Sequence, residues 1–187
     1  MSGPLGSSQW MYASGGYEID QGLKFDGGSY IQRKPSSTGN RRTWTCSGWV
    51  KGAPESNSQT IFDFRDGDSG SSDTLKFQDG TLRFILQDGT NGRLVTNALF
   101  RDPSAWYHIV IAEDSTQGTN TNRSKVYVNG TQITSFSGTI TYPSQNAESR
   151  ANWTSADMRI GHSRNPENST QELNAYLAEV HHIDGTA

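Results

Sequence analysis

Acidic residues cluster between residues 63 and 73, where the sequence reads Asp-Phe-Arg-Asp-Gly-Asp-Ser-Gly-Ser-Ser-Asp. Carboxylate oxygens on a flexible loop can wrap a hard cation such as Ca²⁺, and the candidate ligands are Asp66, Asp68 and Asp73. The spacing differs from the EF-hand rule, which needs a glutamate at loop position 12, and Asp-Gly pairs also form ordinary turns. The segment therefore allows two interpretations, an optional calcium site or plain turn chemistry, and no cofactor is required.

Groups that could act as nucleophiles or acid–base pairs are poorly placed for that chemistry. Cys46 is the only cysteine, and the alternation of residues 43–51 puts it on one face of a strand with Trp44 and Val50, so we expect a buried, inert thiol. A Gly-x-Ser-x-Gly elbow does not occur. No expected strand carries the carboxylate pair that glycoside hydrolysis needs. The sequence therefore predicts a protein that is not an enzyme.

The four histidines are His108, His162, His181 and His182. Neighbouring residues of a strand point to opposite faces, so His181 and His182 cannot easily share a metal ion. His108 lies in an apolar run typical of a central strand. We therefore expect each histidine to be structural.

Aromatic side chains in the expected loops are candidates for stacking on sugar rings. They are Tyr30, Tyr142 and Trp153. Local packing is the alternative for each of them. The remaining tryptophans of the domain, Trp44, Trp49 and Trp106, lie in expected strands and should be buried.

Short strands joined by many turns dominate the pattern. Only 32% of the 187 residues are hydrophobic, 20 are glycine, and no stripe with a period of 3.6 residues is visible. The expected strands cover residues 23–25, 30–31, 43–51, 60–64, 74–77, 81–86, 93–96, 106–112, 125–128, 131–133, 158–161 and 176–183. Such strands favour an all-β fold in which two antiparallel sheets pack face to face, a sandwich or jelly roll.

Turn dipeptides predict which strands pair as hairpins. Asp79-Gly80, Asp88-Gly89 and Asn129-Gly130 sit where tight hairpins need positive φ angles. Asp26-Gly27-Gly28 predicts a further hairpin between the two strands nearest the N-terminus.

Residues 1–20 lack a strand pattern but contain Trp10, Tyr12 and Tyr17. Three exposed aromatic rings would forgo several kcal/mol at about 25 cal/mol per Å². We therefore predict a flexible or partner-docking arm over residues 1–20 and one sandwich domain over residues 21–187. The arm either folds back on its own sandwich or docks on another subunit.

Charge and composition exclude several classes of partner. The net charge of −3 gives no electrostatic footprint for nucleic acid. No run approaches the ~20 apolar residues of a membrane span, so we expect no membrane insertion, and the N-terminus does not resemble a signal peptide. A single cysteine excludes an internal disulfide.

Four segments resemble, in order, the laminin-G-like branch of the concanavalin A-like lectin and glucanase superfamily. They are residues 44–51 (Trp-Thr-Cys-Ser-Gly-Trp-Val-Lys), 106–110 (Trp-Tyr-His-Ile-Val), 126–130 (Val-Tyr-Val-Asn-Gly), and Ile160-Gly161 followed by 176–180 (Tyr-Leu-Ala-Glu-Val). The resemblance implies a concanavalin A-like jelly roll. Some relatives hold calcium at the sandwich rim. The superfamily's glucanases carry Glu-x-Asp-x-x-Glu, which Glu18-Ile19-Asp20 begins, but position 23 is leucine.

Three further stretches, residues 23–30, 100–108 and 176–185, are similar to the version found in virion proteins of tailed phages of marine bacteria. This resemblance implies a tail, fibre or capsid-surface protein that is located in the virion and contacts other virion proteins, further copies of itself and host-surface glycans.

Three functions follow as hypotheses. The first is a non-catalytic structural or adhesion protein of the virion, the second is a carbohydrate-binding module without an assembly role, and the third is a glycoside hydrolase.

Overall fold

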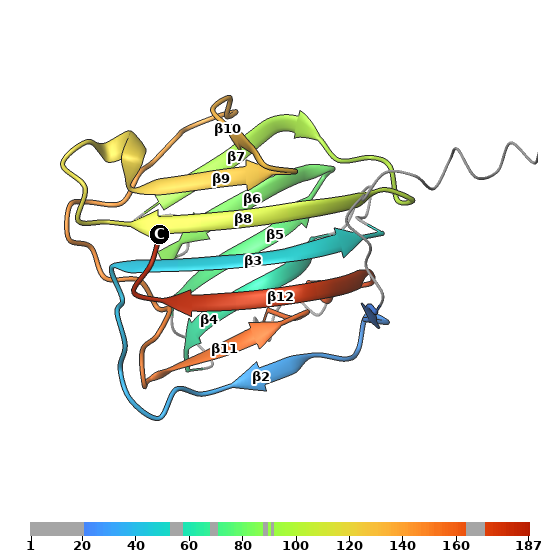
Figure 1. The fold of residues 1–187 in the computed structure, drawn as a ribbon, viewed down its shortest axis with the longest axis horizontal. Coiled ribbons are helices and arrows are strands. Elements are labelled where there is room, and N and C mark those ends of the chain that lie inside the picture. The colour runs from blue at the N-terminus through green and yellow to red at the C-terminus, as the bar shows by residue number, and fades with distance from the viewer. Residues whose placement is uncertain (1–20, 53–57, 68–70, 88–89, 91, 164–170) are drawn as a thin grey trace, which may run out of the picture.

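The computed structural model describes residues 21–52, 58–67, 71–87, 90, 92–163 and 171–187. Twelve strands in this part of the chain form two antiparallel six-stranded sheets, which confirms the predicted sandwich (Figure 1). The candidate arm, with Trp10, Tyr12 and Tyr17, lies outside the described residues, as does Asp68. No helix of the described part is long and apolar enough to cross a membrane.

The first sheet has the strand order β1-β12-β3-β8-β9-β10. Its strands are β1 (Leu23–Lys24), β12 (Tyr176–Asp184), β3 (Thr43–Lys51), β8 (Trp106–Asp114), β9 (Ser124–Val128) and β10 (Thr131–Ile133). The second sheet has the order β2-β11-β4-β5-β6-β7. Its strands are β2 (Ile31–Arg33), β11 (Ala156–Ile160), β4 (Gln59–Asp66), β5 (Ser72–Gln78), β6 (Thr81–Leu86) and β7 (Gly92–Leu99). A 3-10 turn, η3, covers Asn120–Asn122.

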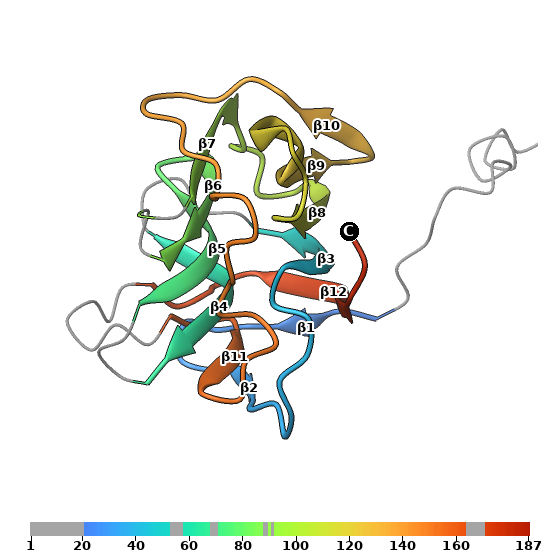
Figure 2. The same cartoon turned by 90° about the vertical axis from the view of Figure 1, so that its left-hand side faces the viewer.

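The core lies between the two sheets, which Figure 2 shows side by side. Strands β3 and β6 alternate strictly between buried and half-buried residues, because every second side chain points toward the other sheet. Trp44, Phe77 and Leu82 are among the largest fully buried side chains. Trp49 and Trp106, which we expected to be buried, are only half-buried. Trp49 points to the outer face of β3, and Trp106 is the first residue of β8.

Two of the predicted tight turns have the expected backbone. Asp79 and Gly80 have φ angles of 53° and 72°, and Asn129 and Gly130 have φ angles of 50° and 78°. Positive φ at both central residues gives the turn a backbone twist that matches the twist of the two strands it joins. The hairpin expected around Asp26-Gly27-Gly28 is wrong, because β1 pairs with β12 in the first sheet and β2 pairs with β11 in the second. That turn connects the two sheets.

Candidate functional site

A polar pocket of about 170 Å³ lies at one end of the sandwich, between β11, the end of β12 and the segment that joins β2 to β3. Its polar wall includes Arg33, Arg150, Asn152, His182 and Asp184, and its apolar wall includes Pro35, Phe64 and Met158. We call this the rim pocket. Its lining comes from residues between 33 and 184, so the fold assembles the pocket from distant parts of the chain.

His182 holds one wall of the rim pocket through both of its ring nitrogens. Nε2 lies 2.6 Å from Asn152 Oδ1, and Nδ1 lies 3.0 Å from Cys46 Sγ. Asn152 Nδ2 donates to the carbonyl oxygen of Asn40 at 2.8 Å, so Asn152 Oδ1 is the acceptor that faces the imidazole. The network therefore assigns the proton to His182 Nε2 and leaves Nδ1 to accept from the thiol. Burial lowers the pKa of His182, which favours this neutral form.

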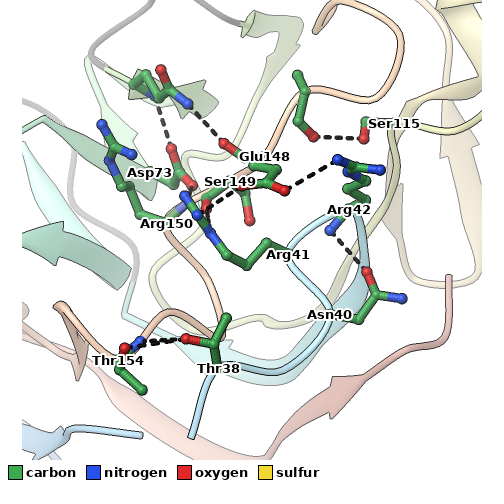
Figure 3. Close-up of polar contacts among 12 residues, drawn as sticks. Thr38, Asn40, Arg41, Arg42, Asp73, Ser115, Glu148, Ser149, Arg150 and Thr154 are labelled. Atoms are coloured by element: carbon green, nitrogen blue, oxygen red, sulfur yellow. Dashed lines mark hydrogen bonds and ion pairs between the residues drawn. The ribbon is translucent and has the colours of Figure 1, made fainter.

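Asp184 fastens the segment after β2 to the end of β12. Its Oδ1 accepts from the backbone N–H of Asn40 at 2.7 Å and from Asn152 Nδ2 at 3.0 Å. The contact leaves no room for a side chain at Gly39, where an added Cβ would lie 2.0 Å from Asp184 Oδ2. The hydroxyl oxygens of Thr38 and Thr154, 3.1 Å apart, join the segment after β2 to the loop before β11 (Figure 3).

A cluster of arginines borders the pocket on the side that Figure 3 shows. Arg41 donates to Glu148 Oε2 at 2.8 Å and to the Ser149 carbonyl at 2.8 Å, and Arg42 donates to Glu148 Oε1 at 3.1 Å. The guanidinium carbons of Arg41 and Arg150 lie 4.5 and 5.1 Å from the ring centre of Trp153. Trp153, a predicted sugar platform, thus stacks with two guanidinium groups of its own chain.

Asp73, a predicted calcium ligand, lies in β5 and not in the expected loop. The strand begins at Ser72, two residues earlier than the sequence predicted, and Asp73 is 1% exposed and opposite Phe64. Its two oxygens accept from the backbone N–H groups of Gln87, at 2.8 Å, and Arg150. Burial raises the pKa of Asp73 to about 6. Asp66 ends β4, and the described residues contain no group of three side chains able to hold a metal ion.

We expect calcium to change the thermal unfolding of this protein only slightly, because Asp73 would have to give up two backbone hydrogen bonds to bind it. The measurement is the melting temperature with 5 mM calcium and with chelator, and the expected shift is below about 5 °C. A larger shift, which for a domain of this size corresponds to about a kcal/mol or more, would instead support a metal site at Asp66, Asp68 and Asp73.

The other two predicted sugar platforms lie elsewhere. Tyr30 is 49% exposed, stacks on His162 with 5.1 Å between ring centres, and lies 5.5 Å from the Arg159 guanidinium. Tyr142 is half-buried and packs against the core. Since Tyr30, Tyr142 and Trp153 have different neighbours, they do not form one platform. A role in glycan binding stays a prediction for each.

Cys46, His182 and Asn152 have the residue types and hydrogen-bond order of a thiol-protease triad, yet the environment prevents that chemistry. Cys46 is 2% exposed and faces the core, and burial raises the pKa of its thiol. A thiol that is protonated and out of a substrate's reach is not a nucleophile. Sequence reasoning placed Cys46 inward but missed this contact, which arises because His182 pairs with Cys46 across β12 and β3.

An apolar groove of about 380 Å³ lies along the open side between the two sheets. Leu23, Phe25 and Leu177 line it from the side of the first sheet, and Ile31 and Ile160 line it from the second. Leu23 is 54% exposed and Ile31 is 47% exposed. The groove starts at Gln21, where the described chain begins.

Known structures share this fold at low sequence identity. Domains LG4-5 of the mouse laminin alpha1 chain match with a TM-score of 0.58 and 16% identity, covering 88% of this chain and 42% of that one. A heptameric SAP-like pentraxin from Limulus polyphemus matches with a TM-score of 0.58 and 17% identity, covering 85% and 73%. Domain 4 of AbnA, a GH43 extracellular arabinanase from Geobacillus stearothermophilus solved in complex with arabinotriose, matches with a TM-score of 0.56 and 16% identity, covering 88% and 70%.

The chain spans less than half of the laminin chain that it matches. No curated protein matches the sequence. A family model described as the concanavalin A-like lectin/glucanases superfamily, of the laminin G type, matches residues 25–186. The match covers most of the chain and agrees with the two-sheet sandwich, so the chain belongs to the concanavalin A-like lectin/glucanase superfamily.

Proposed function

We propose that this domain is a non-catalytic adhesion module that binds a glycan through the rim pocket. The observation that carries the proposal is the fixed geometry of the polar wall, in which His182, Asn152 and Asp184 hold one another in place. Preorganised polar groups beside an apolar surface are typical of small-molecule sites. Arg33 extends this wall and makes no hydrogen bond or ion pair with any residue that the structure describes, so its guanidinium is available to a ligand.

The volume of the rim pocket limits the size of the ligand that it could bind. Its volume of about 170 Å³ is below the roughly 300–1,000 Å³ of sites for drug-sized ligands, so it suits a terminal sugar or a similarly small polar group. Arg33 would donate to sugar oxygens, Asp184 Oδ2 would accept from sugar hydroxyls, and Met158 would contact the apolar face of the ring. The arabinotriose complex of the AbnA domain supports a glycan as the ligand class.

Glycan binding can be tested with a glycan microarray that includes arabinotriose. We expect the wild type to bind a subset of glycans and Arg33→Gln to lose at least tenfold in affinity, because the charged guanidinium with its fork of donors is removed. Gly39→Ala should lose as much, because its Cβ would displace Asp184. The control is Gly118→Ala, whose Cβ meets nothing within 4 Å. The proposal fails if no glycan binds, or if both site variants bind like the control.

We propose that the domain acts in this way on the surface of a phage particle, with residues 1–20 as its assembly device. The resemblance of residues 23–30, 100–108 and 176–185 to phage virion proteins supports the setting. The apolar groove supports this assembly role of residues 1–20, because its lining begins at Gln21, the residue after the arm. The groove also leaves Leu23 and Ile31 exposed. In this proposal Trp10, Tyr12 and Tyr17 dock into the groove of a neighbouring copy.

Deletion of residues 1–20 is expected to give a folded monomer, because the strands of both described sheets lie within residues 23–184. Sedimentation velocity would give the mass of the deletion variant and of the full chain, and a full-length variant with Trp10, Tyr12 and Tyr17 replaced by serine would separate the aromatic rings from arm length. An unchanged oligomeric mass in both variants would contradict the assembly role.

A further inference from the structure

Basic side chains gather on the outer face of the second sheet, over β5, β6 and β7. Phe77, Phe84 and Leu94 of these strands point into the core, so the residues that alternate with them point away from it. Lys76, Arg83 and Arg93 occupy such outward positions, and we call this the basic face. The two sheets are the only layers that the described residues form, so no further sheet covers it (Figure 2).

The strand register brings the cations together. Lys76 of β5 lies directly opposite Arg83 of β6, and Arg93 of β7 lies opposite Ile85, two residues further along β6. Like charges directly opposite each other across two strands are destabilising. Lys76 is also half-buried, and its pKa is lowered by this burial and then by Arg83, while Asp63 opposes the shift and Arg93 and Arg65 add to it. Burial and the neighbouring arginines therefore outweigh Asp63 and disfavour the charge of Lys76 in the folded chain.

Among the described residues, acidic side chains pair with Arg83 but not with Lys76 or Arg93. Asp63 is engaged by Thr74 Oγ1 at 2.9 Å and by Arg65 Nε at 3.5 Å, and Asp79 is engaged by Arg83 at 2.9 Å. Among the described residues, neither Lys76 nor Arg93 has a hydrogen-bonding or ion-pair partner for its side chain. An external anion would supply the missing partner.

We propose that the basic face binds an anionic polysaccharide, with Lys76 and Arg93 each donating to a carboxylate or sulfate group of the sugar chain. Both cations can donate to such oxygens, and Arg93 can do so with two parallel hydrogen bonds. Thr81 lies on the same face, and its hydroxyl can bond to a sugar hydroxyl. This site shares no residue with the rim pocket and does not depend on it.

A nucleic acid fits the same face less well. The outward positions of β4 to β7 in the described residues carry no aromatic ring on which a base could stack.

The test is binding of the full chain to immobilised dextran sulfate, alginate and neutral dextran, with a single-stranded oligonucleotide as a fourth surface. We expect binding to at least one anionic polysaccharide and none to dextran. Lys76→Met and Arg93→Gln should each weaken this binding at least fivefold, and 0.5 M NaCl should remove it by screening. The matched control is Lys125→Met in β9 of the other sheet, which makes the same charge change and should stay within twofold of the wild type.

Thermal unfolding separates binding from folding. Lys76→Met keeps most of the apolar stem and removes the desolvated charge, so we expect an unchanged or higher melting temperature together with the loss of binding. Arg33→Gln in the rim pocket should bind the anionic polysaccharide like the wild type. The proposal is overturned if neither anionic polysaccharide binds, if Lys125→Met weakens binding as much as Lys76→Met, or if the oligonucleotide binds more tightly than both polysaccharides.

Discussion

Replacing Trp44 by alanine is expected to lower the free energy of unfolding by about 3–5 kcal/mol, the range for large aromatic side chains removed from a core. Trp44 is 1% exposed, and its ring centre lies 5.5 Å from that of Phe64 and 6.1 Å from that of Phe84. Its indole N–H donates to Ser149 Oγ at 2.8 Å. The substitution therefore leaves a cavity between the sheets and a buried hydroxyl without its donor.

Urea unfolding at pH 7 measures this loss, and Trp44→Phe is the graded control. Phenylalanine fills most of the space but cannot donate to Ser149, so we expect a loss of about 1–3 kcal/mol. Since domains are stable by only about 5–15 kcal/mol, the alanine variant should be close to unfolding at 37 °C. A loss below 1 kcal/mol for the alanine variant would show that Trp44 does not anchor the core.

Glu113→Gln is expected to stabilise the protein increasingly as the pH rises. Glu113 in β8 is 2% exposed, and burial raises its pKa from 4.5 to about 8, against the opposing hydrogen bond that Ser124 Oγ donates. Between these two values the unfolded chain is ionised while the folded chain keeps its proton. The unfolded state then binds fewer protons, so stability falls as pH rises from about 4.5 to about 8. Glutamine removes this dependence.

The difference in unfolding free energy between Glu113→Gln and the wild type should therefore grow by up to about 1.4 kcal/mol per pH unit and reach about 3–5 kcal/mol at pH 8. Denaturant unfolding at pH 4.5, 6, 7 and 8.5 measures it. Asp114→Asn on the same strand is a control of opposite sign. Burial raises the pKa of Asp114, but the hydrogen bonds from Thr116 and Gln117 together outweigh it and lower the pKa below 3.8. Asp114→Asn should therefore be less stable than the wild type by an amount that stays constant across these four pH values. A difference for Glu113→Gln that does not change with pH would contradict the prediction.

Local sequence signals predicted most of the strands because alternation and turn chemistry act within a few residues. The segments 43–51 and 81–86 match β3 and β6 in full. The hairpin expected at Asp26-Gly27-Gly28 was wrong, since a turn between two sheets and a turn within one sheet use the same residues. Asp73 was assigned to a loop because its strand begins in a polar stretch that alternation cannot distinguish from a turn.

The rim pocket was not predictable from the sequence, because it depends on contacts between distant residues. The rim pocket requires His182 of β12 to lie beside Cys46 of β3. It also requires Asn152 to form hydrogen bonds with both His182 and Asp184. The basic face is more local, because the predicted turn at Asp79-Gly80 sets Lys76 opposite Arg83. A net charge of −3 gave no sign of it, because a sum over the chain hides a local excess of the opposite charge. Relatives at 16–17% identity show the fold and leave these side chains unassigned.

The position of β12 between β1 and β3 also determines how the chain can fold during synthesis. Trp44 pairs with Asp184, so β3 has only one of its two neighbours until the ribosome has made residues 176–184. Until then the β3 edge exposes unpaired N–H and C=O groups that other chains can bind. Closing so long a loop is slow, and sandwiches with such distant pairings fold in milliseconds to seconds. The nascent chain should therefore be most prone to aggregation, and most dependent on chaperones, just before its last strand emerges.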